Sequence, residues 1–74
     1  MRIYADPNNC TADHKLRLIV EGALRDIAKL EGQMQPGAPV TFYGEDFEMQ
    51  GVLERDENDE MWLGVADWAS WKDL

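Results

Sequence analysis

PVTFYGEDFEMQGVLERDENDEMWLGVADW, residues 39–68, alternates apolar and polar side chains in three runs that are separated by two acidic turns. A period of two residues is typical of strands that bury one face, so we predict three strands, at about 39–43, 47–56 and 60–66. The alternation shifts at Gly51, because the apolar Val52 and Leu53 are adjacent. A glycine at such a shift predicts a bulge or a sharp bend. Bends of this kind allow a short sheet to curl into a partial barrel.

The residues before these strands have the period of an amphipathic helix. Apolar side chains recur at i, i+3, i+4 and i+7 and form one stripe, which consists of Leu16, Ile19, Val20, Ala23, Leu24, Ile27 and Leu30. We predict a helix at about 11–32, with Thr11 as its N-cap and Gly32 as the residue that ends it. Gly22 inside this helix costs up to about 1 kcal/mol relative to alanine, which a close approach of the sheet would explain.

Together these elements predict an α+β fold in a single domain, residues 1–74. One N-terminal amphipathic helix packs on a strongly bent antiparallel β-meander. Residues 1–5, MRIYA, add a short N-terminal strand at the edge of the sheet. Residues 67–74 form a C-terminal turn, in which the three-residue spacing of Trp68 and Trp71 fits one helical turn.

The size and composition of the chain restrict the class of protein. A chain of 74 residues buries only about 60% of its unfolded surface and often needs a disulfide, a metal or a partner for stability. Cys10 is the only cysteine, so it forms no internal disulfide, and a lone thiol fits the reducing cytosol. The sequence lacks the pattern of a signal peptide and any run of about 18 apolar residues that would span a membrane. We therefore expect a cytoplasmic protein that does not enter the membrane.

The net charge of −8 is carried entirely by the second half of the chain. Residues 39–74 contain ten acidic and two basic side chains, whereas residues 1–38 contain five of each. Such a charge repels phosphates, so direct binding to nucleic acid is not expected. The charge instead fits association with a basic protein surface, or solubility alone.

The predicted strands also carry a pattern that resembles a known family. The pattern is V-x-F-Y-G-x-x-F-x-x-x-G-V-L-x-x-D followed by W-L-x-x-A-D, and its residues are Val40, Phe42, Gly51, Leu53, Asp56, Leu63 and Asp67. It resembles the first Sm motif of the Sm-like small barrels, and other SH3-like barrels also contain such a bent strand. The resemblance covers about residues 12–67 and implies a helix followed by bent strands in an SH3-like or Sm-like partial barrel.

The chain also departs from the Sm-like pattern. The Asn-containing loop and the Arg/Lys-Gly signature of the RNA-binding Sm-like proteins are absent, so RNA binding is not implied. The closer analogy is with acidic Sm-like relatives that bind and inhibit a nucleic-acid-handling protein.

Two groups of residues have the composition of a chemical site. Cys10 and His14 lie at the predicted start of the helix, where a helix N-terminus lowers the pKa of a thiol, but no neighbouring residue supplies an oxyanion hole. Residues 56–60 resemble a calcium-binding loop, but Met61 stands where that loop needs glycine. A half-buried cysteine and a solvated turn are the simpler interpretations. We therefore predict a protein that is not an enzyme, with no catalytic residue, no metal and no cofactor.

The acidic side chains form the strongest candidate for a binding surface. Eight of them lie within residues 45–60, opposed only by Arg55, and in a meander we expect both turns and one sheet face to carry this charge together. Trp62 is out of phase with its apolar neighbours, so it stands either on the outer face among the acids, as a hot spot would, or over the core. The predicted partner-binding residues are Glu45, Asp46, Glu48, Glu54, Asp56, Glu57, Asp59, Glu60, Trp62 and Tyr43.

These observations favour binding over chemistry. We hypothesise a non-enzymatic, acidic protein-binding module that regulates or inhibits a basic, nucleic-acid-handling partner. A phage or mobile-element inhibitor of a bacterial defence complex would fit the size and acidity of the chain. The alternative is a small structural subunit that self-assembles as a homo-oligomer through free strand edges.

Overall fold

The predicted antiparallel meander is present in the computed structural model, which describes residues 1–74. It consists of β3 (Pro39–Tyr43), β4 (Phe47–Asp56) and β5 (Met61–Ala66), and these bounds differ from the predicted ones only at the start of β5. β3 pairs with β4, and β4 pairs with β5, both antiparallel. The inward-facing side chains of the first two strands are buried in the core, and they are Val40, Phe42, Phe47, Met49 and Leu53.

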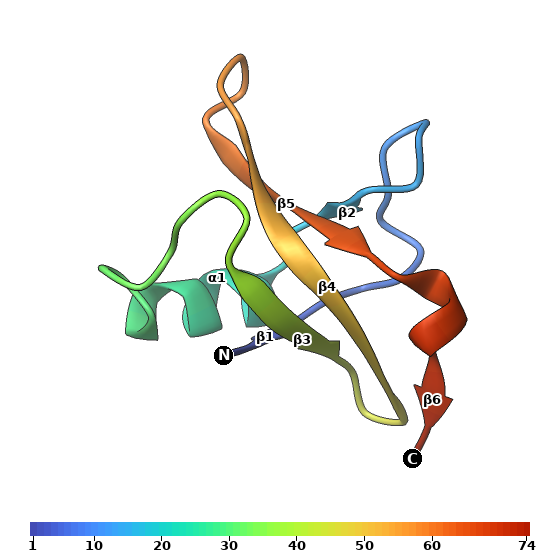
Figure 1. The fold of residues 1–74 in the computed structure, drawn as a ribbon. Coiled ribbons are helices and arrows are strands. Elements are labelled where there is room, and N and C mark those ends of the chain that lie inside the picture. The colour runs from blue at the N-terminus through green and yellow to red at the C-terminus, as the bar shows by residue number, and fades with distance from the viewer.

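Three short strands extend the meander into a mixed, six-stranded sheet (Figure 1). β1 (Arg2–Tyr4), the predicted N-terminal edge strand, pairs in parallel with β3. β2 (Leu16–Arg17) pairs with β5, which gives the strand order β1-β3-β4-β5-β2. β6 (Lys72–Asp73) pairs with the first residues of β4. The sheet curls strongly into a half-barrel, which confirms the α+β class and is compatible with a small β-barrel-like fold.

The middle strand, β4, contains no bulge at Gly51. It pairs with β3 along its first half and with β5 along its second half, and both registers are continuous. The predicted shift in parity does not occur, because Gly51 itself takes the inward position between Met49 and Leu53. Val52 faces outward and is 38% exposed. Of the two predicted alternatives, the bend is therefore the one observed, as a curl of the sheet along β4 (Figure 1).

The ring of Phe42 explains why two glycines lie in this sheet. Phe42 is fully buried on β3. A Cβ on Gly64 would lie 2.5 Å from the Phe42 Cζ, and a Cβ on Gly51 would lie 2.8 Å from its Cε2. Gly64 is on β5, two strands away from β3, so the curl of the sheet brings β5 over the ring. Hydrogen atoms at both glycine positions leave the space that the ring fills.

The helix α1 spans Glu21–Lys29, so the predicted helix at 11–32 is too long. Residues 11–20 form turns and β2 instead. Leu16 and Leu18 are buried while Arg17 between them is exposed, which is the alternation of a strand. The pairing of β2 with β5 joins residues that are far apart in the chain. The spacing of apolar residues within one short segment does not reveal such a contact.

Neither predicted cap acts on α1. Thr11 closes a turn, in which its Oγ1 accepts the Lys15 N–H at 3.1 Å and its carbonyl accepts the His14 N–H at 3.0 Å. Val20 occupies the N-cap position and makes no side-chain hydrogen bond to the helix. Gly32 has a left-handed φ of +91°, but it lies in a turn after α1 has ended.

α1 packs against β1, and this contact accounts for Gly22. A Cβ on Gly22 would lie 2.6 Å from the Cδ1 of Tyr4 on β1, which confirms the predicted close approach of the sheet. Ala23 is fully buried next to it. The predicted apolar stripe is only partly buried, because Ile19 and Leu24 are 45% and 53% exposed. Neither α1 nor η1 has the length and apolar composition that a membrane-spanning helix requires.

The C-terminal residues form the predicted single helical turn and then β6. The turn is η1 (Trp68–Ser70), and the side chain of Asp67 caps it by accepting the Ala69 N–H. After η1, the ring of Trp71 stacks on Phe47 with 4.3 Å between the ring centroids and 7° between the planes. The Trp68 ring lies 6.5 Å from that of Trp71 and nearly parallel to it. The tail is thus attached to the start of β4.

We predict that Gly64→Ala lowers the free energy of unfolding by about 1–3 kcal/mol, because the new methyl group overlaps the ring of Phe42. Phe42→Leu in the same chain should recover part of this loss, since it removes the overlapped atoms. Urea unfolding of both single variants and the double variant measures the coupling between the two sites.

Gly51→Ala serves as the control for this cycle. Its methyl group would also overlap the backbone oxygen of Val65, which no side-chain change removes. Phe42→Leu should therefore leave most of the Gly51→Ala loss in place. Additive effects of Gly64→Ala and Phe42→Leu would contradict this account of the core.

Candidate partner-binding site

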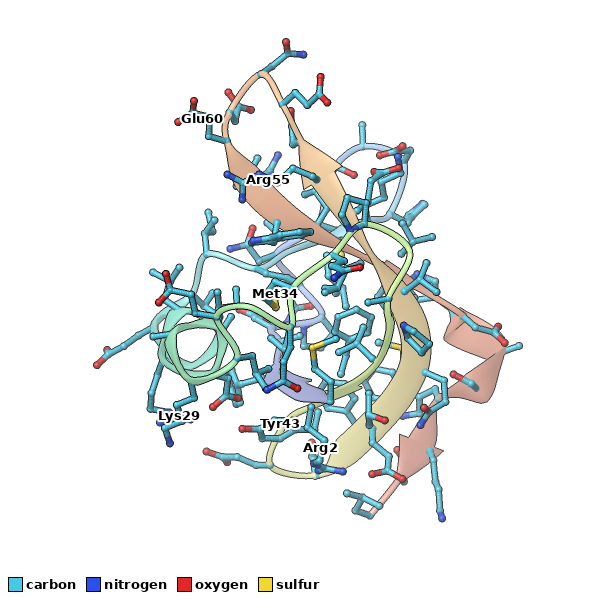
Figure 2. All side chains as sticks on the ribbon, turned by 60° about the vertical axis from the view of Figure 1, so that its left-hand side comes forward. Arg2, Lys29, Met34, Tyr43, Arg55 and Glu60 are labelled. Carbon is cyan, nitrogen blue, oxygen red and sulfur yellow. The ribbon has the colours of Figure 1, made fainter.

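The structure divides the predicted acidic face between the two ends of the meander. Successive turns of a meander lie at opposite ends of the shared strand, and the ten residues of β4 place about 30 Å of strand between them at 3.3 Å per residue. Figure 2 shows Arg55 and Glu60 at one end, and Arg2 and Tyr43 at the other. The expectation that both turns carry the charge together is therefore wrong, although Glu48, Glu54 and Asp56 do share the outward-facing side of β4.

The turn between β4 and β5 forms one acidic end, which we call the acidic tip (Asp56–Glu60). The Oδ1 of Asp56 accepts the backbone N–H groups of Asn58 at 3.0 Å and Asp59 at 3.3 Å, which fixes the turn. Glu57, Asp59 and Glu60 are exposed and form no ion pair within the chain. The hairpin projects from the sheet (Figure 1), so these three carboxylates face solvent.

Two of the predicted acidic residues are paired with basic side chains of the chain itself. Glu54 lies 2.7 Å from the Lys15 Nζ, and its hydrogen bond raises the pKa of that lysine. Glu48 lies 3.3 Å from the Arg2 guanidinium. Both pairs connect β4 to the N-terminal segment. The charges of Glu48 and Glu54 are therefore partly neutralised within the chain, whereas those of the acidic tip remain available to a partner.

Of the two predicted alternatives for Trp62, the structure shows the position over the core. β5 places Trp62 opposite Arg55, on the same side of the sheet as Leu53 and Gly64. Its ring packs against the buried cluster, and the Arg55 guanidinium lies 5.1 Å from the ring centroid. Trp62 also lines a cavity of about 420 Å³ beside the C-terminal end of α1, together with Met34.

Tyr43, another predicted binding residue, takes part in the attachment of α1 to the sheet. Its hydroxyl donates to the Oδ2 of Asp26 at 2.5 Å, and the backbone N–H of Tyr4 donates to the same oxygen at 2.9 Å. Asp26 is only 9% exposed. The guanidinium of Arg2 lies 4.8 Å from the centre of the Tyr43 ring. Sequence reasoning missed Asp26, because an acidic residue on a short helix carries no local signal of a buried partner.

The hydrogen bonds of Asp26 change two pKa values. Burial by itself raises the pKa of Asp26, but the hydrogen bonds from Tyr43 and from the Tyr4 amide, with the charge of Arg25, outweigh burial and lower it. The hydrogen bond between the Tyr43 hydroxyl and Asp26 also raises the pKa of Tyr43. The ionised carboxylate and the neutral phenol are thus the favoured pair in the folded protein.

A groove at the other end of the meander brings together residues that the sequence separates. Its volume is about 470 Å³, and we call it the aromatic groove; its lining residues are Tyr4, Ala5, Asp6, Pro7, Gly44, Glu45, Asp46, Phe47 and Trp71. They come from the end of β1, the turn between β3 and β4, and the C-terminal tail. Two predicted residues, Glu45 and Asp46, lie here. Asp6, Phe47 and Trp71 were missed, because no local pattern places three distant segments side by side.

The two chemical sites that the sequence suggested have no matching geometry. Residues 10–14 are not helical, so no helix N-terminus acts on Cys10. Its thiol donates to the Pro7 carbonyl at 3.2 Å, and burial, together with the charge of Asp6, raises the pKa of the thiol. No group of three or more His, Cys, Asp or Glu side chains is arranged to hold a metal ion.

The Asp26 hydrogen bonds should make stability depend on pH in the acid range. Because the pKa of Asp26 is lower in the folded protein than in the unfolded chain, its contribution is complete above the unfolded pKa, about 4, and is lost as the pH falls through the folded pKa. We expect Asp26→Asn to lower the unfolding free energy by about 1–3 kcal/mol at pH 7, and by less at pH 3. Urea unfolding at both pH values measures the difference.

Glu21→Gln is the matched control for Asp26→Asn, since Glu21 lies on the same helix and is exposed. It should have little effect at either pH. A loss from Asp26→Asn that stays constant between pH 7 and pH 3 would contradict the assigned ionisation.

Cys10 should react slowly with thiol reagents. The raised pKa leaves little thiolate at neutral pH, and the thiolate is the reactive form. We expect slower alkylation by iodoacetamide at pH 7.5 than for a cysteine-containing peptide, with a rate that still rises above pH 9. A faster rate than the peptide's would identify an activated thiol and contradict this prediction.

Comparison of the chain with protein-family models, with curated proteins and with solved structures finds no match. The two acidic ends of the meander are therefore the features of the chain that bear most directly on its function.

Proposed function

We propose that this protein is a non-enzymatic protein-binding module that docks on the basic surface of a nucleic-acid-handling partner and regulates or inhibits it. The observation that carries the proposal is the acidic tip. Glu57, Asp59 and Glu60 are exposed at the end of a projecting hairpin and have no basic partner within the chain. Elsewhere on β4, Glu48 and Glu54 do have such partners.

The charge of the tip would act mainly on recognition and on the rate of association. A net charge of −8 on 74 residues attracts a basic surface and raises the association rate, and this effect falls as salt increases. A basic groove that normally holds a phosphate backbone presents the complementary charge. A narrow two-stranded hairpin with three free carboxylates is the part of this chain that would enter such a groove.

The biological role that we propose is inhibition by occupation of a nucleic-acid site. A phage or mobile-element inhibitor of a bacterial defence complex has the size and acidity of this chain. We also propose that the meander is related to the Sm-like barrels. In support, the pattern residues Phe42, Gly51 and Leu53 lie on the curled strands, with their side-chain positions facing the core.

Self-assembly through strand edges has less support. The outer edge of β1 is partly occupied, because Asp26 accepts the Tyr4 N–H there. At the other edge, β2 is only two residues long and forms a bridge to Cys10. Short or covered edges are poor templates for pairing with another chain. Sedimentation at low protein concentration tests this alternative, which requires an oligomer.

The test of the proposed function is capture of basic proteins with charge variants. We expect the double variant Glu57→Gln/Asp59→Asn to reduce the binding of its captured partner about fivefold, since each exposed ion pair contributes about 0.5 kcal/mol. Affinity measured at low and at high salt should show a weaker salt dependence for this variant. Partner capture from the host lysate, followed by titration of the purified partner, provides the measurement.

Glu21→Gln/Glu31→Gln is the control, because it removes the same charge from exposed positions at the two ends of the helical segment. It should change the affinity by less than about twofold, because it alters only the contribution of net charge to binding. Equal losses from both double variants, or no loss from either, would contradict docking through the acidic tip.

A further inference from the structure

The aromatic groove lies at the opposite end of the meander from the acidic tip and has a different composition. It is formed where the turn after β3, the end of β1 and the tail meet. One wall is aromatic, because the exposed ring of Trp71 is stacked on Phe47, which is itself only 3% exposed. Carboxylates lie beside this wall. The tip, by contrast, has no apolar side chain within residues 56–60.

The aromatic wall is held in place before any partner binds. Trp71 stacks on Phe47 at 4.3 Å, and its indole N–H donates to the Oδ1 of Asp73 at 2.8 Å. The tail that carries it is fixed by the pairing of β6 with β4 and by the Leu74 N–H, which donates to the Asp46 carbonyl at 2.9 Å. Trp71 nevertheless remains 39% exposed. A large, fixed and accessible ring loses little conformational entropy when a ligand packs on it.

The carboxylates of the groove have no basic partner in the chain. Asp6, Glu45 and Asp46 line it, and none of them forms an ion pair within the chain. The Oδ1 of Asp6 accepts the Asn8 N–H at 2.9 Å, which leaves the rest of its acceptor capacity free. An aromatic wall beside three unpaired negative charges is complementary to a ligand that combines an apolar stem with a positive charge.

We infer that the aromatic groove binds one arginine side chain of the partner protein. The methylene stem of arginine would pack on the exposed part of the Trp71 ring, since such stems are apolar. The planar guanidinium donates two parallel hydrogen bonds to a carboxylate, which favours it over the ammonium group of lysine. A purely apolar ligand would leave the carboxylates of the groove without a partner, and an acidic ligand would be repelled by them. The inference rests on the proposed function, because it names what the basic partner presents to this second site.

The test uses the full chain, labelled with ¹⁵N, and three capped peptides of the form Gly-X-Gly with X as arginine, lysine or citrulline. Citrulline has the shape of arginine without its charge. We expect the arginine peptide to give saturable shifts of the Trp71 indole and Gly44 amide signals, with a dissociation constant on the order of millimolar. The Trp62 indole, which lies in a different cavity, should not move.

Two double variants locate the site. Glu45→Gln/Asp46→Asn should weaken binding of the arginine peptide at least about fivefold, because it removes two of the three carboxylates. Glu57→Gln/Asp59→Asn, at the acidic tip, should leave that binding unchanged. Both changes are on turns at the surface, and the unchanged positions of the other amide signals confirm that each variant is folded.

The inference is overturned by the absence of saturable shifts, by equal binding of the citrulline peptide, or by equal binding of the lysine peptide. It is also overturned if the shifts map to the acidic tip. The proposed function is judged separately by partner capture with the tip variant. A tip variant that loses the partner while the groove binds no arginine peptide would support the function and reject the groove.

Discussion

The ring of Phe42 and the two glycines that face it determine how strongly the sheet curls. β3 and β5 are separated by β4 in the strand order, yet Gly64 on β5 lies against the Phe42 ring. An open, gently twisted sheet would keep those two strands too far apart for this contact. The curl encloses the buried side chains of a 74-residue chain on one concave side, where a flat sheet would expose them. Both ends of the meander are therefore placed by a packing constraint at its centre.

Asp26 completes this arrangement on the open side of the half-barrel. The helix α1 is only nine residues long, and isolated helices of that length are not stable in water. A single carboxylate that accepts from Tyr4 and Tyr43 connects it to two parallel strands at once. The contact also uses a backbone N–H at the outer edge of β1. The same interaction thus positions the helix and partly covers a strand edge.

The sequence predicted the elements whose signal is local and missed those that depend on distant partners. The strands of the meander follow from the alternation in residues 39–66, and the close approach at Gly22 follows from a glycine within a helix. The start of the helix was placed wrongly, because Leu16 fits a helical stripe as well as a strand, and only pairing with β5 decides between them. The alternation of side chains along residues 61–66 is visible in the sequence. Whether Trp62 or its neighbours face the core, however, depends on how the whole sheet curls. The aromatic groove joins three segments, so no single window of sequence contains it.

The separation of the acidic residues changes what their charge can do. At physiological salt the screening length is about 8 Å, whereas about 30 Å of strand separates the two ends of β4. The tip and the groove are therefore independent electrostatic sites, although Asp46 of the groove is only ten residues from Asp56 of the tip in the sequence. The tip carries free carboxylates on a projecting hairpin, so it would attract a basic surface at long range but would discriminate little between partners of different shape. The groove adds a fixed apolar wall to its charge, which suits selection of one side chain. A partner that engages both would need two basic features at a fixed spacing, and such a spacing discriminates between basic proteins better than net charge does.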